Sequence, residues 1–189
     1  MLYRFALSSI AALALSVNAL AETFQLDKEN SKIEFVGSKP PKDGKVESHT
    51  GGFKEFGSVF VFSPEKEAES KLVIEIEAAS LTSDNPKLTD HLKHPDFFDV
   101  KKYPDIRFEA TGYEKDKEDE SKGILKGNLK LLDKTQEVSV PYKVEKSDSH
   151  VTIIAAFKID RTKWGMTYGV PNVNAEVDIK STLKYKVKK

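Results

Sequence analysis

The sequence predicts an all-β protein, a single closed antiparallel barrel of about eight strands with one short helix near a barrel mouth. Short segments alternate apolar and polar residues with period two, which is typical of strands with one buried face. Turn-forming residues separate these segments, and one stretch alone has helical character. An antiparallel sheet with this many strands favours closure, because closure removes its exposed edges.

The first half of the chain contains three predicted strands before the helix. Residues 31–37 and 71–79 alternate cleanly between apolar and charged side chains. Residues 53–62 are apolar on both faces, so we expect one strand that is covered on both sides. Residues 38–44 are rich in proline, glycine and lysine, which predicts a loop between the first two strands.

The helix is predicted between Asn85 and Pro95. Asn85 is a favourable N-cap, and Pro86 suits the first helical position, where its missing N–H costs nothing. Leu88 and Leu92 are four residues apart and share one helix face. Two phenylalanines follow directly, so we expect this segment to cover one mouth of the barrel.

The second half has the clearest strand pattern. Its alternating segments are residues 105–113, 125–131, 137–145, 151–159 and 177–187. The nearly all-charged run 115–122 indicates a solvated hairpin loop, and Asp133-Lys134 indicates a turn. Pro141 falls on the outward-facing set, where it marks an edge or a bulge. No linker divides the chain, which predicts one barrel domain over residues 22–189.

The N-terminus has the pattern of a secretion signal. Arg4 precedes an apolar stretch from Phe5 to Val17, and Ala19-Leu20-Ala21 fits a cleavage site. The apolar stretch is short for a membrane span, so residues 1–21 are interpreted as a cleaved signal peptide. We therefore expect an exported, soluble, periplasmic protein without an integral membrane span.

Composition narrows the class of partner. The chain has 30 Lys plus Arg and 30 Asp plus Glu, a balance that argues against nucleic acid or anionic lipid headgroups as the main partner. There is no cysteine, so the hydrophobic core has to stabilise the fold without disulfides. An interior lined by alternating apolar residues favours a carrier of a hydrophobic molecule.

Several motifs resemble the YceI-like family. The central stretch His91–Val100, HLKHPDFFDV, is followed by YPDIRF at 103–108. The later segments GILKGNL at 123–129 and FKIDR at 157–161 are also similar, and the resemblance extends from Phe24 to Tyr185. It implies an exported bacterial protein with a lipocalin-like antiparallel barrel. It also implies a bound polyisoprenoid lipid, such as a prenyl quinone or a polyprenyl phosphate, and no other cofactor.

The opening of the domain departs from that family pattern. Gly51-Gly52-Phe53 keeps the expected start of a strand, but the residues between Val36 and Gly52 differ from the usual strand-and-helix opening. We therefore expect one barrel mouth to have a different shape, with a consequence for the ligand accepted.

The candidate ligand-binding residues are apolar side chains of the inward-facing set, of the helix and of the segment after Arg161. They are Phe35, Phe60, Ile74, Ile76, Leu92, Phe97, Phe98, Phe108, Leu129, Tyr142, Phe157, Trp164, Met166 and Ile179. Burial of an isoprenoid chain among them gains roughly 25 cal/mol per Å². Alternatively, the same side chains fill the barrel, and the protein acts through its surface as a stress-protective or partner-binding module. Both alternatives are compatible with a homodimer.

Arg161 is the candidate for contact with a lipid headgroup. The alternative is structural, with Arg161 paired to Asp96 or Asp99 and Trp164 packed over the barrel end. His91 and His94 are three residues apart on the helix, but without cysteine the sequence lacks a zinc ligand set, so no metal is predicted. No nucleophile-elbow pattern is present either, and we expect a binding protein rather than an enzyme.

Overall fold

The computed structural model describes residues 22–63 and 70–187, so the predicted signal peptide lies outside the described residues. The strands are β1 (Glu22–Leu26), β2 (Lys32–Ser38), β3 (Ser48–Phe53), β4 (Phe56–Phe62), β5 (Lys71–Glu77), β6 (Leu81–Ser83), β7 (Asp105–Lys115), β8 (Lys122–Leu131), β9 (Lys134–Lys146), β10 (His150–Asp160) and β11 (Glu176–Val187). The helices are α1 (Pro86–Leu92) and the short 3₁₀ helices η1 (Lys28–Asn30), η3 (Ala78–Ser80) and η4 (Arg161–Trp164).

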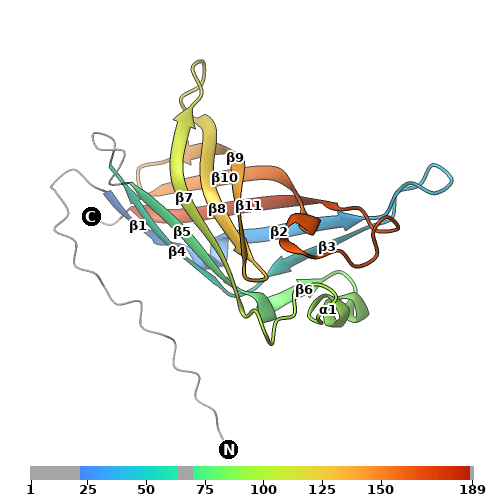
Figure 1. The fold of residues 1–189 in the computed structure, drawn as a ribbon. Coiled ribbons are helices and arrows are strands. Elements are labelled where there is room, and N and C mark those ends of the chain that lie inside the picture. The colour runs from blue at the N-terminus through green and yellow to red at the C-terminus, as the bar shows by residue number, and fades with distance from the viewer. Residues whose placement is uncertain (1–21, 64–69, 188–189) are drawn as a thin grey trace, which may run out of the picture.

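The sheet closes on itself, as the sequence predicts. The strand order runs β1-β4-β5-β7-β8-β9-β10-β11, and β1 also pairs with β11, which closes an antiparallel barrel of these strands (Figure 1). Residues 178–182 of β11 pair instead with β2, and β3 and β6 extend the sheet from there. The long β11 thus belongs to the barrel at one end and to the β2–β3–β6 extension at the other.

The structure differs from the sequence prediction in several details. Residues 22–26 are not among the predicted strands, yet they form β1 and close the barrel, whereas the predicted strand at 31–37 forms β2 in the extension. The apolar run 53–62 is divided between β3 and β4, because Phe53 pairs with Leu81 of β6 whereas Phe56 pairs with Ile76 of β5. The β8–β9 turn lies at Leu132 and Asp133, which have positive φ angles of 50° and 61°. A two-residue turn with both φ angles positive matches the twist of a hairpin, so it connects β8 directly to β9.

The helix begins as predicted. The side chain of Asn85 accepts hydrogen bonds from the backbone N–H groups of Lys87 (3.0 Å) and Leu88 (3.3 Å), and Pro86 occupies the first turn. Leu92 is buried in the core. The cap and the two leucines therefore fix α1 against the open end of the barrel, beside β6 (Figure 1).

The opposite end of the barrel is filled by aromatic side chains. The rings of Phe24 and Phe60 stack with centroids 4.5 Å apart, and Phe60 lies 5.0 Å from the ring of Tyr185. Tyr185 is fully buried, and its hydroxyl is 2.8 Å from the hydroxyl of Ser58. This packing closes one end of the interior and leaves the other end, near α1, to form the mouth.

The buried hydroxyl of Tyr185 predicts a loss of stability at high pH. Burial raises the pKa of Tyr185 from 10.0 to about 12, although the hydrogen bond with Ser58 acts in the other direction. The unfolded chain therefore releases this proton first, and stability falls as pH rises from 10 towards 12. Two pKa units correspond to about 2.7 kcal/mol at most. Urea unfolding between pH 10 and 12 should show this loss of unfolding free energy in the wild type. In Tyr185→Phe the free energy of unfolding should fall less steeply with pH; an equal pH dependence in the two proteins would contradict the assignment.

Candidate functional site

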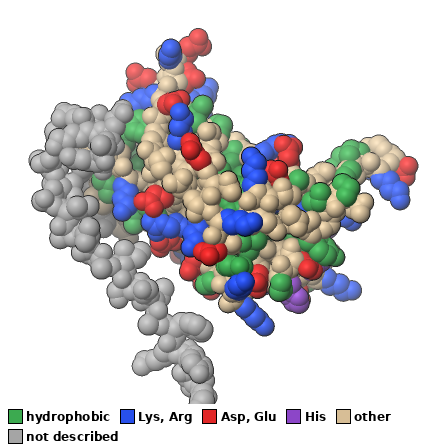
Figure 2. Space-filling model, viewed as in Figure 1, with side chains coloured by type: hydrophobic (Ala, Val, Ile, Leu, Met, Phe, Trp, Pro, Cys, Tyr) green, Lys and Arg blue, Asp and Glu red, His purple; other side chains and the backbone are tan. Residues whose placement is uncertain are grey.

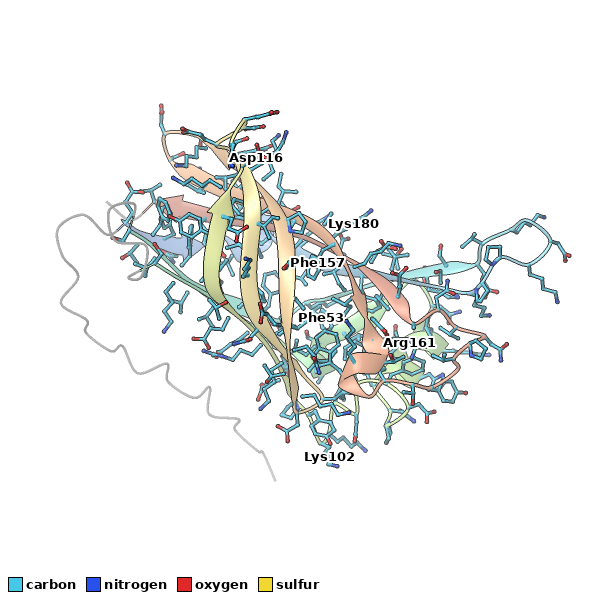
Figure 3. The ribbon with its side chains drawn as sticks, turned by 45° about the horizontal axis from the view of Figure 1, so that its top comes forward. Phe53, Lys102, Asp116, Phe157, Arg161 and Lys180 are labelled. Carbon is cyan, nitrogen blue, oxygen red and sulfur yellow. The ribbon has the colours of Figure 1, made fainter. Side chains whose placement is uncertain are left out.

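The interior of the barrel contains a cavity of about 400 Å³ near the mouth. Its walls are mainly apolar side chains from β2, β3, β5, β7, β8, β9, β10 and β11. Representative wall residues are Ile33, Phe35, Leu72, Ile74, Phe108, Leu125, Leu129, Ile153, Phe157, Ile179 and Leu183. Phe157 lies midway along the barrel in Figure 3, and Phe53 lies closer to the mouth. The barrel interior is thus only partly filled by its own side chains.

Small residues keep this space open. Ala155 of β10 and Ser181 of β11 are direct cross-strand partners, and both line the cavity. On β8, Gly127 makes room for the ring of Phe108, since a Cβ atom at Gly127 would stand 2.5 Å from that ring. A large side chain at Ala155 or Ser181 would occupy space that now belongs to the cavity.

The mouth of the cavity lies between α1, the hairpin that joins β2 to β3, and the loop 165–175. Polar side chains of the hairpin form its rim. Lys39 Nζ is 2.8 Å from Glu47 Oε1, and His49 Nδ1 is 3.0 Å from Asp84 Oδ1. The hydrogen bond from Lys39 lowers the pKa of Glu47, and the backbone N–H of Thr50 lowers the pKa of Asp84, so both carboxylates stay charged. A ligand in the cavity would have its polar end close to Lys39, Glu47 and His49, which line it.

Aromatic rings form the other side of the mouth. The ring centroids of His91 and Phe97 are 5.1 Å apart, and Tyr168 packs edge-on against both rings at 5.1 and 5.3 Å. His91 Nε2 also lies 3.0 Å from Asp96 Oδ2. This cluster connects the α1 segment to the loop 165–175, and its rings are in the position to cover a bound chain.

Arg161 lines the cavity, but its guanidinium donates to backbone carbonyl groups. Nε donates to Asn174 O (3.1 Å), and Nη2 donates to Tyr168 O (2.9 Å) and Val173 O (3.3 Å). Nη1 donates to Met166 O. The side chain is 3% exposed, and burial lowers its pKa. The ion pair with Asp96 or Asp99 considered from the sequence is replaced by these bonds, which hold the loop 165–175 in place (Figure 3).

Most of the sequence-predicted residues come together around the cavity. Those that line it are Phe35, Ile74, Ile76, Leu92, Phe97, Phe98, Phe108, Leu129, Phe157, Met166 and Ile179. Phe60, Tyr142 and Trp164 lie elsewhere. Phe60 belongs to the filled end, and Tyr142 lies against Gly123 of β8. Trp164 is 2% exposed, and its indole N–H donates to the backbone oxygen of Leu129 at 3.0 Å, so it anchors η4 to β8.

Sequence reasoning left out other lining residues. Leu72, Leu125, Ile153, Ala155 and Leu183 line the cavity, and each shares a strand face with a residue that was selected. The period-two spacing along each strand is the signal that identifies them. The polar rim had no such signal, because a loop has no period that tells which side chains face inward.

Among residues 22–63 and 70–187, no three histidine, aspartate or glutamate side chains gather as metal ligands. In the same part of the chain, no helix has the length and hydrophobicity needed to cross a membrane.

A closed antiparallel barrel with an interior cavity and a short helix at its mouth defines a lipocalin-like class of protein. Within this class, the chain belongs to the YceI-like domain family, whose model matches residues 24–185. The motifs at 91–108, 123–129 and 157–161 lie inside that match, so the resemblance seen in the sequence is confirmed.

Individual proteins are also similar to this chain in sequence or in structure. A "UPF0312 protein" of Pseudomonas putida is 36% identical over 109 residues, which cover 54% of this chain and 56% of that protein. The match thus spans about half the length of this curated relative. The crystal structure of Burkholderia cenocepacia BcnA is similar, with a TM-score of 0.73 and 25% identity over 85% of this chain and 99% of that one.

A polyisoprenoid binding domain from Saccharophagus degradans, implicated in plant cell wall breakdown, has the same fold. Its TM-score is 0.65, with 15% identity, and the match covers 89% of this chain and 99% of that domain. At this level of identity the likeness concerns the fold.

Proposed function

We propose that this protein is an exported, periplasmic carrier that binds the isoprenoid chain of a prenyl quinone or polyprenyl phosphate inside its barrel. The observation that carries the proposal is the apolar cavity, which opens at a mouth with a polar rim. That arrangement suits a ligand with a long hydrocarbon chain and one polar end. The family and the polyisoprenoid binding domain from Saccharophagus degradans support this choice of ligand class.

The size of the cavity sets how much of the chain is enclosed. A buried apolar space of about 150 Å³ accommodates benzene, with its six carbons, so 400 Å³ accommodates about three isoprene units. The aromatic packing of Phe24, Phe60 and Tyr185 prevents deeper entry. The remainder of a longer chain, or the headgroup, would therefore lie at the mouth.

Affinity for prenyl alcohols should rise with chain length and then level off. We expect farnesol to bind at least tenfold more tightly than geraniol, because the added carbons leave water at about 0.8 kcal/mol per CH₂ before ordering costs. The gain in affinity from farnesol to geranylgeraniol should be smaller than the gain from geraniol to farnesol. Calorimetry or competition with a fluorescent lipid measures the series. Equal affinity for all three alcohols, or no binding of any, would contradict the proposal.

Mass spectrometry of the natively purified protein tests the ligand class directly. Organic extraction should release a prenyl quinone or a prenyl phosphate in stoichiometric amount. An empty extract from a protein that also fails to bind added prenyl lipids would instead favour a role exerted through the surface.

A further inference from the structure

The strongest exposure of large hydrophobic side chains occurs beside the cavity mouth. Among the described residues, Val46 is 60%, Tyr168 is 48% and Val170 is 43% exposed, ahead of Ile124 and Val59 on the strands. Val46 belongs to the β2–β3 hairpin, and the other two belong to the loop 165–175. Exposed apolar side chains that concentrate at one site indicate an interaction surface.

The two loops are connected to each other. Asn174 N–H donates to Ser38 O (2.9 Å), and the Asn174 side chain donates to Ser38 Oγ (2.9 Å), so the loop 165–175 is held at the base of the hairpin. The hairpin projects well beyond the barrel in Figure 1, and Figure 2 shows hydrophobic side chains along it. Both loops therefore stand at the end of the molecule where the cavity opens.

Their composition suits the surface of a bilayer. Residues 165–175 contain no charged side chain, although 32% of the whole chain is charged. The hairpin combines exposed Pro40, Pro41 and Val46 with three lysines and two acidic residues, Asp43 and Glu47, so it carries a small excess of positive charge. Apolar side chains enter the interface between headgroups and acyl chains, tyrosine favours that depth, and lysine reaches back to phosphate groups.

We infer that these two loops, here called the mouth loops (residues 39–47 and 165–175), dock the protein on a phospholipid bilayer so that the cavity opens towards the membrane. The choice of a bilayer over a protein partner rests on the proposed function, since an isoprenoid chain partitions into membranes. Apolar insertion is the main contribution, and the lysines add a smaller electrostatic one. Docking in this orientation lets a chain pass between bilayer and cavity without crossing water.

Vesicle flotation tests docking separately from ligand binding. The full mature protein is mixed with phosphatidylcholine vesicles that contain no isoprenoid, with and without phosphatidylglycerol. The wild-type protein should float with both, and phosphatidylglycerol should strengthen binding less than tenfold. The double variant Val46→Ser/Val170→Ser should bind at least tenfold more weakly. The matched control Val59→Ser/Ile124→Ser removes exposed side chains from the strands and should bind as the wild type does.

The same variants should bind farnesol in vesicle-free buffer as the wild type does, because neither Val46 nor Val170 lines the cavity. If the wild type does not bind farnesol, the proposed function is contradicted. If the wild type binds farnesol but does not float with vesicles, docking alone is overturned. Equal flotation of the two double variants would also overturn it. A concentration-dependent dimer that Val46→Ser/Val170→Ser abolishes, without wild-type flotation, would assign the surface to a second copy of the chain.

Discussion

Replacing Ala155 by phenylalanine is expected to weaken the binding of farnesol at least about 100-fold while the barrel stays folded. Ala155 is 6% exposed and faces the cavity beside Ser181, so the new ring enters existing empty space. A benzene-sized group takes about 150 Å³. It displaces roughly six carbons of the ligand at about 0.8 kcal/mol each, of which a part remains after ordering costs. A net loss of about 2.7 kcal/mol corresponds to the 100-fold change.

The stability of this variant separates blocking from unfolding. Filling a cavity recovers contacts that the native protein lacks, so the free energy of unfolding should change by no more than about 1 kcal/mol. Ala156→Phe is the matched control, because Ala156 is exposed on the outer face of the same strand, opposite Lys180. Urea unfolding and calorimetry measure both variants. Wild-type affinity in Ala155→Phe would place the lipid outside the cavity.

Alternation predicted which face of each strand turns inward, but it carries no information on height along the barrel. Ile74, Phe108, Phe157 and Ile179 have the expected face and the expected height, and they line the cavity. Phe60 also shares the inward-facing set but lies at the filled end, where it packs on Tyr185. Height depends on the register between strands, which is a long-range property that local spacing leaves undetermined.

The closure of the sheet was predictable because it depends mainly on local patterns. Most of the alternating segments and the helix capped by Asn85 follow from local rules, and the structure contains them, although it adds β1 and β6. The extension of the sheet through β3 and β6 does not follow from them. It depends on Phe53 pairing with Leu81, across a sequence separation that no local pattern encodes. The hairpin and the loop 165–175 form the mouth on the same basis, through the Asn174–Ser38 contacts.

The sequence shows that Arg161 is a cationic hydrogen-bond donor, but it does not show which groups accept its hydrogen bonds. Arg161→Met is expected to lower the free energy of unfolding by at least about 3 kcal/mol, because carbonyl groups of the loop 165–175 lose their donors at roughly 1 kcal/mol or more each. For a chain of this size the melting temperature should fall by about 6–12 °C. Arg161→Lys should recover only part of this loss, since an ammonium group lacks the planar fork of donors.

Arg107→Met is the matched control, because Arg107 is a surface residue on β7 that pairs with Glu75 and Glu109. Exposed ion pairs of this kind contribute about 1 kcal/mol or less, so the free energy of unfolding of this variant should stay close to that of the wild type. Ligand binding then separates the two roles considered for Arg161. If the guanidinium acts only through the loop, Arg161→Met weakens farnesol and farnesyl phosphate by the same factor. A loss confined to the phosphate, with stability unchanged, would instead establish Arg161 as a headgroup ligand and contradict the structural role.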